Sequence, residues 1–126
     1  MKLEGAGVLL RIYIGESDQH DGRPLYQAIV ERLRDRGIAG ATVLRGIEGF
    51  GAHARLHTTR LLRLSEDLPI LIEVVDSDER IHDVLPELDG MVRDGLITME
   101  KVQVIAYRGR DAGRVPGDGQ PEEAGG

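Results

Sequence analysis

Two short apolar segments, residues 8–15 (VLLRIYIG) and 69–75 (PILIEVV), constrain the fold of this chain more than any other feature. Both are rich in β-branched and other apolar side chains, a composition typical of the central strands of a sheet. Each is followed by a segment whose apolar residues recur at helical spacing. The chain therefore has to pack two amphipathic helices against a sheet that contains both strands.

The first predicted helix begins at Pro24, a residue favoured at the first helical position, and ends before Gly37, a typical residue beyond a helix C-terminus. Leu25, Ile29 and Leu33 recur at intervals of four residues and form an aliphatic face. We expect that face to be buried against the sheet.

The second predicted helix follows Asp76, which would form an Asp-type capping box with Glu79, and it would end at Gly95. Pro86 should kink this helix or remove one of its hydrogen bonds, because proline has no backbone N–H. The apolar positions at helical spacing are Ile81, Val84, Leu85, Leu88, Met91 and Val92.

Residues 41–44 (ATVL) and 102–107 (VQVIAY) are predicted to be two further strands, which makes the order of elements βαββαβ. Right-handed crossovers then give a four-stranded antiparallel sheet with both helices on one face, an α+β, ferredoxin-like sandwich. Few polar residues interrupt the strands at 8–14 and 69–75. We therefore expect both faces of the sheet to be apolar, and the uncovered face to mediate oligomerisation.

The 126 residues suffice for one domain, which we place at residues 1–108. Residues 109–126 are rich in glycine, proline and charge without periodicity, and we predict that they form a disordered tail. The chain contains no cysteine, so disulfides, thiolate metal sites and thiol catalysis are excluded.

Charge and hydropathy narrow the range of partners. The net charge of −6 argues against a nucleic-acid binder, because phosphate contacts need a basic surface. No apolar run approaches the roughly 18 residues that a membrane span needs. The N-terminal apolar stretch is short and is interrupted by Arg11, unlike a signal peptide. We therefore expect a cytoplasmic protein without direct membrane insertion.

Several segments resemble a known family. Residues 37–43 (GIAGATV) and 49–51 (GFG) are similar to the glycine-punctuated second strand of PII signalling proteins. Residues 67–75 (DLPILIEVV) and 95–104 (GLITMEKVQV) are similar to the third strand of PII and to its loop and fourth strand. The segments GESDQHDGRPLYQAIV, ATVLRGIEGFG and LLRLSEDLP resemble still more closely the uncharacterised PII-like family called domain of unknown function 190. The resemblance covers nearly all of residues 8–107.

This resemblance implies a homotrimer with ligand clefts at the subunit junctions. PII proteins bind adenine nucleotides there, and members of the wider group are sensors that dock onto channels, transporters or enzymes. By matching positions, the resemblance implies that Gly40 and Thr42 lie near the adenine and ribose. It also implies that Gly49 and Gly51 let the backbone approach the phosphates.

Basic residues near the C-terminus complete the implied site. Lys101 matches the phosphate-contacting lysine of PII, and Arg108 and Arg110 match the region of the arginines that close over the nucleotide. PII has Gly-Asp-Gly before its lysine, whereas this chain has Thr-Met-Glu at residues 98–100, a poorer cradle for a triphosphate. We therefore expect AMP or ADP to be preferred to ATP, as a regulatory ligand and not as a cofactor.

Arg45, Arg55, Arg60 and Arg63 form a local basic cluster in an acidic chain. The arginine fork suits phosphate and carboxylate groups. We interpret Arg45 and Arg55 as contacts to a ligand or partner, and Arg60 and Arg63 as surface residues. The glycines at 46–51 could form an anion nest or only a bulge and the start of a loop, and both interpretations stay open.

His53 and His57 stand four residues apart, but no third ligand follows at a matching spacing, so we predict no metal site. The chain has no Walker, dinucleotide-binding or serine-hydrolase motif, and we expect it not to be an enzyme. A small enzyme and a metal-tolerance-type protein remain open as alternatives.

The leading hypothesis is a PII-like homotrimeric regulator that senses an adenine nucleotide or another small anion. It would signal through loop 50–68 to a protein partner, such as a membrane transporter or an enzyme. The alternative is a trimeric scaffold, or an accessory subunit of a transporter or channel, that works without any ligand.

Overall fold

The computed structural model describes residues 3–51, 57–58 and 67–109. The main elements are β1 (Gly5–Gly15), α1 (Leu25–Asp35), β4 (Thr42–Arg45), β7 (Pro69–Asp76), α3 (Asp78–Met91) and β8 (Leu96–Val104). Two-residue strands form small ribbons, in which β2 (Gln19–His20) pairs with β3 (Arg23–Pro24) and β5 (Glu48–Gly49) pairs with β6 (His57–Thr58). The predicted tail lies outside the described residues from position 110 onward.

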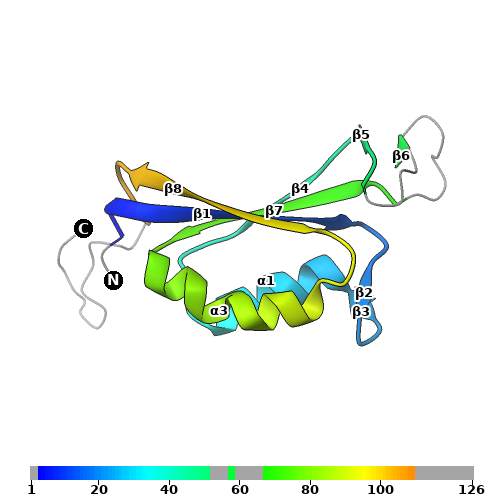
Figure 1. Cartoon of the computed structure of the whole chain (residues 1–126), viewed down its shortest axis with the longest axis horizontal. Coiled ribbons are helices and arrows are strands. Elements are labelled where there is room, and N and C mark those ends of the chain that lie inside the picture. Colours follow the sequence, from blue (N-terminus) through cyan, green and yellow to red (C-terminus); the bar gives the residue numbers. More distant parts are fainter. Residues whose placement is uncertain (1–2, 52–56, 59–66, 110–126) are drawn as a thin grey trace.

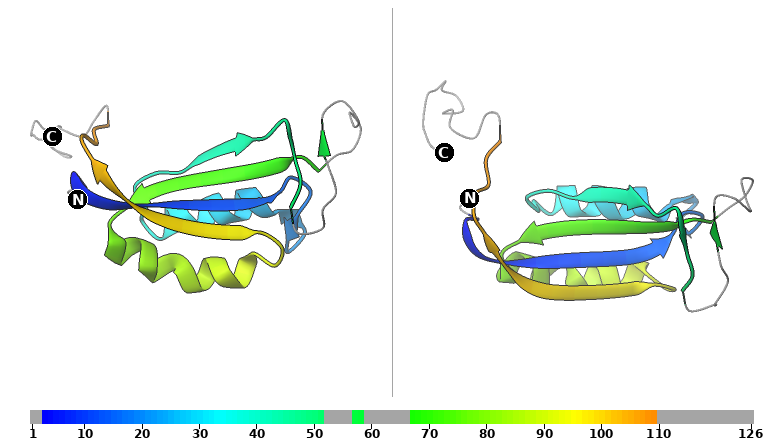
Figure 2. Two further views of the ribbon diagram at one scale, coloured as in Figure 1. Left: turned by 45° about the horizontal axis from the view of Figure 1, so that its top comes forward. Right: turned by 90° about the horizontal axis from the view of Figure 1, so that it is seen from above.

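The main sheet has four strands in the order β4-β7-β1-β8, and every neighbouring pair is antiparallel. Helices α1 and α3 lie side by side on one face of this sheet (Figure 1; Figure 2). The predicted α+β, ferredoxin-like sandwich is therefore confirmed. None of the described helices is long and apolar enough to cross a membrane.

The core lies between the sheet and the two helices. Burial alternates along β7, where Ile70, Ile72 and Val74 face the helices and are almost fully buried. The aliphatic faces predicted for the two helices belong to this core. Each buried Leu or Ile stabilises the fold by about 1.5–3 kcal/mol relative to an exposed one. The core residues from β1 and the helices are Val8, Leu10, Ile12, Ile14, Leu25, Ala28, Ile29, Leu33, Ile81, Val84, Leu88 and Met91.

The ends of α3 differ from the prediction. Strand β7 extends to Asp76, so Ser77 caps the helix instead, and its side chain accepts a hydrogen bond from the backbone N–H of Arg80 at 3.2 Å. The helix contains Pro86 and ends at Met91, before the predicted stop at Gly95. The prediction of Asp76 as the cap was wrong by one residue, because Asp76 is the last residue of strand β7.

Strand β8 begins six residues earlier than predicted and ends at Val104. It pairs with β1 over nine positions, from Gly5↔Val104 to Tyr13↔Leu96. The sequence also predicts a tight turn at residues 94–100 before this strand, and that prediction is wrong. The long pairing with β1 holds residues 96–101 in the sheet although they are not a continuous apolar run. Lys101 consequently lies well inside the strand.

The uncovered face of the sheet is less uniform than predicted. Residues directly opposite each other in antiparallel strands share a face. The pairing therefore aligns Leu44, Leu71, Tyr13 and Leu96 across all four strands, and we call this set the apolar row. The next set on the same face is Thr42, Glu73, Arg11 and Thr98, the polar row. Polar residues thus interrupt the face that was expected to be apolar throughout.

Candidate functional site

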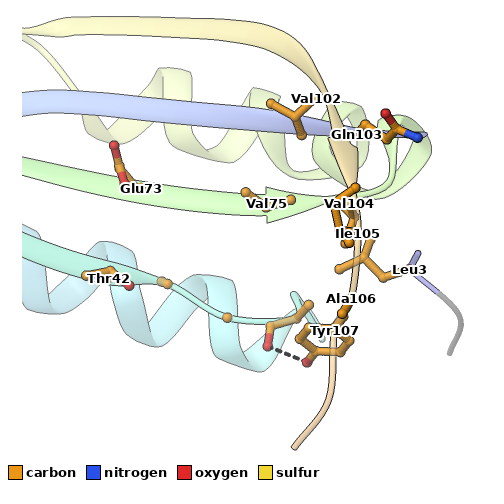
Figure 3. A pocket seen from close by; sticks show the side chains of 13 residues that line it. Leu3, Thr42, Glu73, Val75, Val102, Gln103, Val104, Ile105, Ala106 and Tyr107 are labelled. Atoms are coloured by element: carbon orange, nitrogen blue, oxygen red, sulfur yellow. Dashed lines mark hydrogen bonds between the residues drawn. The ribbon is translucent and has the colours of Figure 1, made fainter. Parts of the chain in front are cut away.

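A pocket of about 750 Å³ lies where β4 begins and β8 ends. It spans the uncovered face near one end of the sheet, and its walls come from segments that are far apart in the sequence (Figure 3). Most lining side chains are apolar, as in typical small-molecule sites. The lining residues are Leu3, Ala39, Gly40, Ala41, Thr42, Glu73, Val75, Val102, Gln103, Val104, Ile105, Ala106 and Tyr107.

The segment that follows β8 forms one wall of the pocket. The hydroxyl of Tyr107 donates a hydrogen bond to the carbonyl oxygen of Ala39 at 2.9 Å (Figure 3). The backbone N–H of Tyr107 donates to the carboxylate of Glu4 at 3.2 Å. Because β4 and β8 are the opposite edges of the sheet, this segment has to cross the end of the sheet to reach Ala39. Residues 105–107 therefore act as a strap beside the pocket.

A buried carboxylate holds the opposite wall in place. Asp76 is fully buried, and it accepts a hydrogen bond from the backbone N–H of Ala39 at 2.9 Å. Its other partners are the N–H of Ser77 at 2.7 Å and the Nε of Arg80 at 3.4 Å. Arg80 also donates to the carbonyl oxygen of Gly37, whose φ of 79° ends helix α1 as predicted. The first turn of α3 thus fixes the loop that leads into β4.

The charge of the pocket comes from a carboxylate. Among the described residues that line it, Glu73 is the only Asp, Glu, Lys or Arg. Its Oε2 atom accepts a hydrogen bond from the Nε of Arg11 at 3.0 Å. The same guanidinium reaches Glu100 through Nη1 at 3.2 Å. The hydrogen bond with Glu73 is the main reason that the pKa of Arg11 is raised above its ordinary value.

Two of the predicted ligand residues line this pocket, namely Gly40 and Thr42. Arg108 directly follows the strap and is exposed. Lys101 is also exposed, but it pairs with Val8, a core residue, so its side chain starts from the face that carries the helices. Within one protomer, the structure therefore does not place Lys101 on the wall of the pocket.

The remaining described candidates lie at the opposite end of the sheet, near β5 and β6 (Figure 1). Arg45 donates a hydrogen bond to Glu16 at 2.7 Å. A Cβ atom added to Gly49 would lie 3.2 Å from the ring of Pro69, and one added to Gly51 would meet nothing within 4 Å. The close approach of Pro69 leaves little room for a side chain at Gly49.

Some sequence predictions fall outside the described residues, namely those on Arg55, Arg60, Arg63, Arg110 and His53. The same holds for most of loop 50–68. His57 belongs to β6 and pairs with Gly49. Within the part of the chain that is described, no group of three or more His, Asp or Glu residues is arranged to hold a metal ion.

Sequence reasoning missed Glu73, Val75 and the strap as parts of the site. Glu73 did carry a usable signal, since it is the single charged residue in the apolar segment 69–75. Tyr107 gave no such signal, because it follows the apolar residues of VQVIAY and reads as the end of a strand.

The fold is similar to that of PII-like proteins. A solved structure of CPII, a nitrogen regulatory PII-like protein from Thiomonas intermedia bound to ADP, AMP and bicarbonate, superimposes with a TM-score of 0.62. The two sequences are 18% identical, and the match covers 79% of this chain and 88% of CPII. A CPII structure bound to ADP, AMP and acetate gives a TM-score of 0.56 at 18% identity, over 88% of this chain and 95% of CPII.

Sequence comparison then assigns the family. The model of the DUF190 family, described as Uncharacterized ACR, matches residues 7–104, and the chain belongs to this family. A UPF0166 protein of Aquifex aeolicus is 40% identical over 97 residues, which are 77% of this chain and 91% of the relative. A UPF0166 protein of Methanocaldococcus jannaschii is 39% identical over 102 residues, or 80% of this chain and 92% of the relative. The resemblance noted in the sequence is thereby confirmed.

Proposed function

We propose that this protein is a homotrimeric, PII-like regulator that binds an adenine nucleotide in the pocket beside the strap. The pocket itself carries the proposal, because its volume of about 750 Å³ falls in the usual range for small-molecule sites. CPII, which shares the fold, binds ADP and AMP. The mainly apolar walls suit a nucleobase, and the two predicted residues Gly40 and Thr42 stand on one side.

The positions of the other candidates support the proposed trimer. Arg45, Gly49 and Gly51 are at the far end of the sheet from the pocket, so in one protomer they cannot contact the same small ligand. A neighbouring protomer could bring them to it. The phosphates would then lie outside the apolar walls, within reach of Arg108 and of Lys101 at the sheet edge.

Nucleotide binding should be measured by calorimetry and thermal shift on the full chain with AMP, ADP, ATP and adenosine. A ligand present at 100 times its dissociation constant stabilises the folded state by ~2.7 kcal/mol. We expect AMP or ADP to bind more tightly than ATP. An absence of binding by all four compounds at millimolar concentration would refute the proposal.

A second candidate function is a trimeric scaffold that needs no ligand, and the apolar row supports it. Leu44, Tyr13 and Leu96 are exposed large apolar residues on the uncovered face. Such a surface is typical of an interface. The scaffold would form the same trimer and bind its partner equally well with and without nucleotide, whereas the regulator would shift its affinity for the partner when nucleotide is added.

In either case we propose that the protein acts on a protein partner and is not an enzyme. The predicted partner loop, 50–68, is for the most part outside the described residues. The transporter or enzyme that it would contact therefore remains a prediction from the sequence.

A further inference from the structure

The two edge strands of the main sheet expose large apolar side chains on both of their faces. Val43 on β4 is 37% exposed and Met99 on β8 is 42% exposed. Both stand opposite core residues of the neighbouring strand, so they start from the face that carries the helices. Leu44 and Leu96 lie on the uncovered face of the same two edges, at 47% and 54% exposure. Each edge is therefore apolar on both sides.

Strands β4 and β8 form the opposite edges of the sheet (Figure 2). Strand β8 pairs with β1 without a bulge over nine positions, and residues 96–104 contain no proline. In the sheet that the structure describes, neither edge strand has a partner on its outer side. An open edge is a template for another strand, and natural proteins usually protect it with prolines, bulges or charged residues. Two open edges with exposed apolar residues indicate that further strands cover them.

Two backbone hydrogen bonds show which residues direct their N–H and C=O groups outward. The N–H of Gly46 donates to the carbonyl oxygen of Pro69 at 2.7 Å, and the N–H of Glu16 donates to that of Leu68 at 2.8 Å. Bonded and non-bonded pairs alternate along antiparallel strands. The even-numbered residues of β4 and β1 therefore bond to β7, which leaves the odd-numbered residues of β1 to bond to β8. These stand opposite even-numbered residues of β8, so the outward groups belong to odd-numbered residues on both edges.

The open edges match each other in one register. Two edges can bond when their outward residues stand directly opposite each other, which also keeps the side chains of one face together. In the matching register, the apolar row and the polar row of one copy each continue into the same row of the next copy. The resulting pairs are Leu44 with Leu96, Val43 with Ile97 and Thr42 with Thr98. A shift by two residues in either direction sets Leu44 opposite Thr98 or Asp94, and the apolar match is lost.

Pairing of β8 with itself is disfavoured by charge. A two-fold axis perpendicular to the sheet preserves its faces, so β8 paired with β8 over all nine residues sets Glu100 opposite Glu100 of the second copy. The next register sets Lys101 opposite Lys101. Like charges directly opposite each other destabilise a strand pair. The β4 edge of a second copy avoids both contacts.

We propose that copies of this chain join edge to edge, with β8 of one copy antiparallel to β4 of the next in the register that pairs Thr98 with Thr42. The inference rests on the proposed function, because it states how the copies of the proposed trimer are joined. The contact is heterologous, so it forms a ring when the rotation between copies closes. A ring that curves toward the uncovered face buries the apolar row and leaves the helices outside. The competing explanation is that the copies touch only through apolar side chains, with both edges left open.

Cysteine cross-linking separates these explanations, because the natural chain contains no cysteine. Thr42→Cys and Thr98→Cys are combined in one chain, which is oxidised with copper phenanthroline and run on a non-reducing gel. Within one chain the two positions are three strand spacings apart, roughly 14 Å, which is too far for a disulfide. Between paired copies their Cα atoms are about 4.5–5.5 Å apart, within disulfide range. We expect linked species of two and three chains and nothing larger, because the ring is closed, and no such ladder from either single variant.

The matched control combines Thr42→Cys with Glu100→Cys, which moves one cysteine by two residues along the same face. Such diagonal neighbours have Cα atoms about 7–8 Å apart, so this variant should link little or not at all. Glu100→Cys alone tests the two-fold arrangement, and efficient linking of two chains through it would overturn the inference. A control that links as well as the test variant would also overturn it, because the register would then be wrong.

Circular dichroism and sedimentation of the reduced variants check folding and assembly. Val43→Cys combined with Ile97→Cys tests the same register on the other face, and it keeps the inference falsifiable if the threonine variant does not assemble. A reduced variant that is a folded trimer but does not link on oxidation would overturn this inference alone. A wild type that is not a trimer would overturn the proposed function as well.

Discussion

Replacing Asp76 by alanine should destabilise the protein strongly for a single substitution outside the aliphatic core. The change removes the acceptor for the N–H groups of Ala39 and Ser77 and the ion-pair partner of Arg80. A buried donor left without an acceptor costs about 1–3 kcal/mol. Both N–H contacts are partly buried, so we take about 1 kcal/mol for each. The Arg80 side chain is 40% exposed, and its ion pair adds at most about 0.5 kcal/mol. The expected loss of unfolding free energy is therefore about 2–3 kcal/mol.

Urea denaturation at one fixed protomer concentration measures this loss. With a slope of about 1–3 kcal/mol per molar urea, the midpoint should fall by roughly 0.7–3 M. Asp83→Ala is the control, because Asp83 on α3 is 72% exposed and pairs with Arg36 at the C-terminal end of α1; it should cost less than about 1 kcal/mol. A loss in Asp76→Ala no larger than that in Asp83→Ala would show that the buried carboxylate does not hold the pocket wall as argued.

Four further predictions concern packing, assembly, the phosphate and the tail. Gly95→Ala should destabilise the fold by about 1–3 kcal/mol in urea, because the added Cβ would lie 2.5 Å from a backbone carbonyl oxygen. Gly90→Ala, with nothing within 4 Å inside helix α3, should instead stabilise it by up to about 1 kcal/mol. Leu44→Lys, which charges the apolar row, should convert a trimer into smaller species in sedimentation, and an unchanged mass would exclude this face as the interface. Lys101→Ala should weaken AMP but not adenosine in calorimetry if Lys101 contacts the phosphate, and equal effects would remove it from the site. Deleting residues 112–126 should leave the melting temperature unchanged, and a large drop would contradict the assignment of a tail without a fold.

The helices and the central strands could be predicted because their signals are local. Leu25, Ile29 and Leu33 all face the core of the finished protein, as their spacing required. Gly37 has a positive φ, the conformation that glycine favours after a helix. The alternating burial of β7 places Ile70, Ile72 and Val74 in the same core. Neighbouring residues within one segment determine these features, so periodicity reveals them.

Element ends and the pocket depended on contacts between distant segments. Strand β8 includes residues 96–101 because they pair with β1, some ninety positions earlier in the chain. Asp76 belongs to the sheet, which shifted the helix cap to Ser77. No local pattern reports a pairing partner that far away in sequence, so the prediction placed these boundaries by composition and was wrong.

By itself, the sequence determined the fold class and the aliphatic core. Its resemblance to PII also singled out Gly40 and Thr42, which both line the pocket. Only the tertiary structure decided that Glu73 and Tyr107 share a pocket with them, and that Arg45 lies at the other end of the sheet. The reason is geometric. Strand pairing sets Thr42 opposite Glu73, and the chain after β8 crosses the sheet end to bring Tyr107 to Ala39. These contacts join residues that are more than thirty positions apart, and they exist only once the sheet has formed.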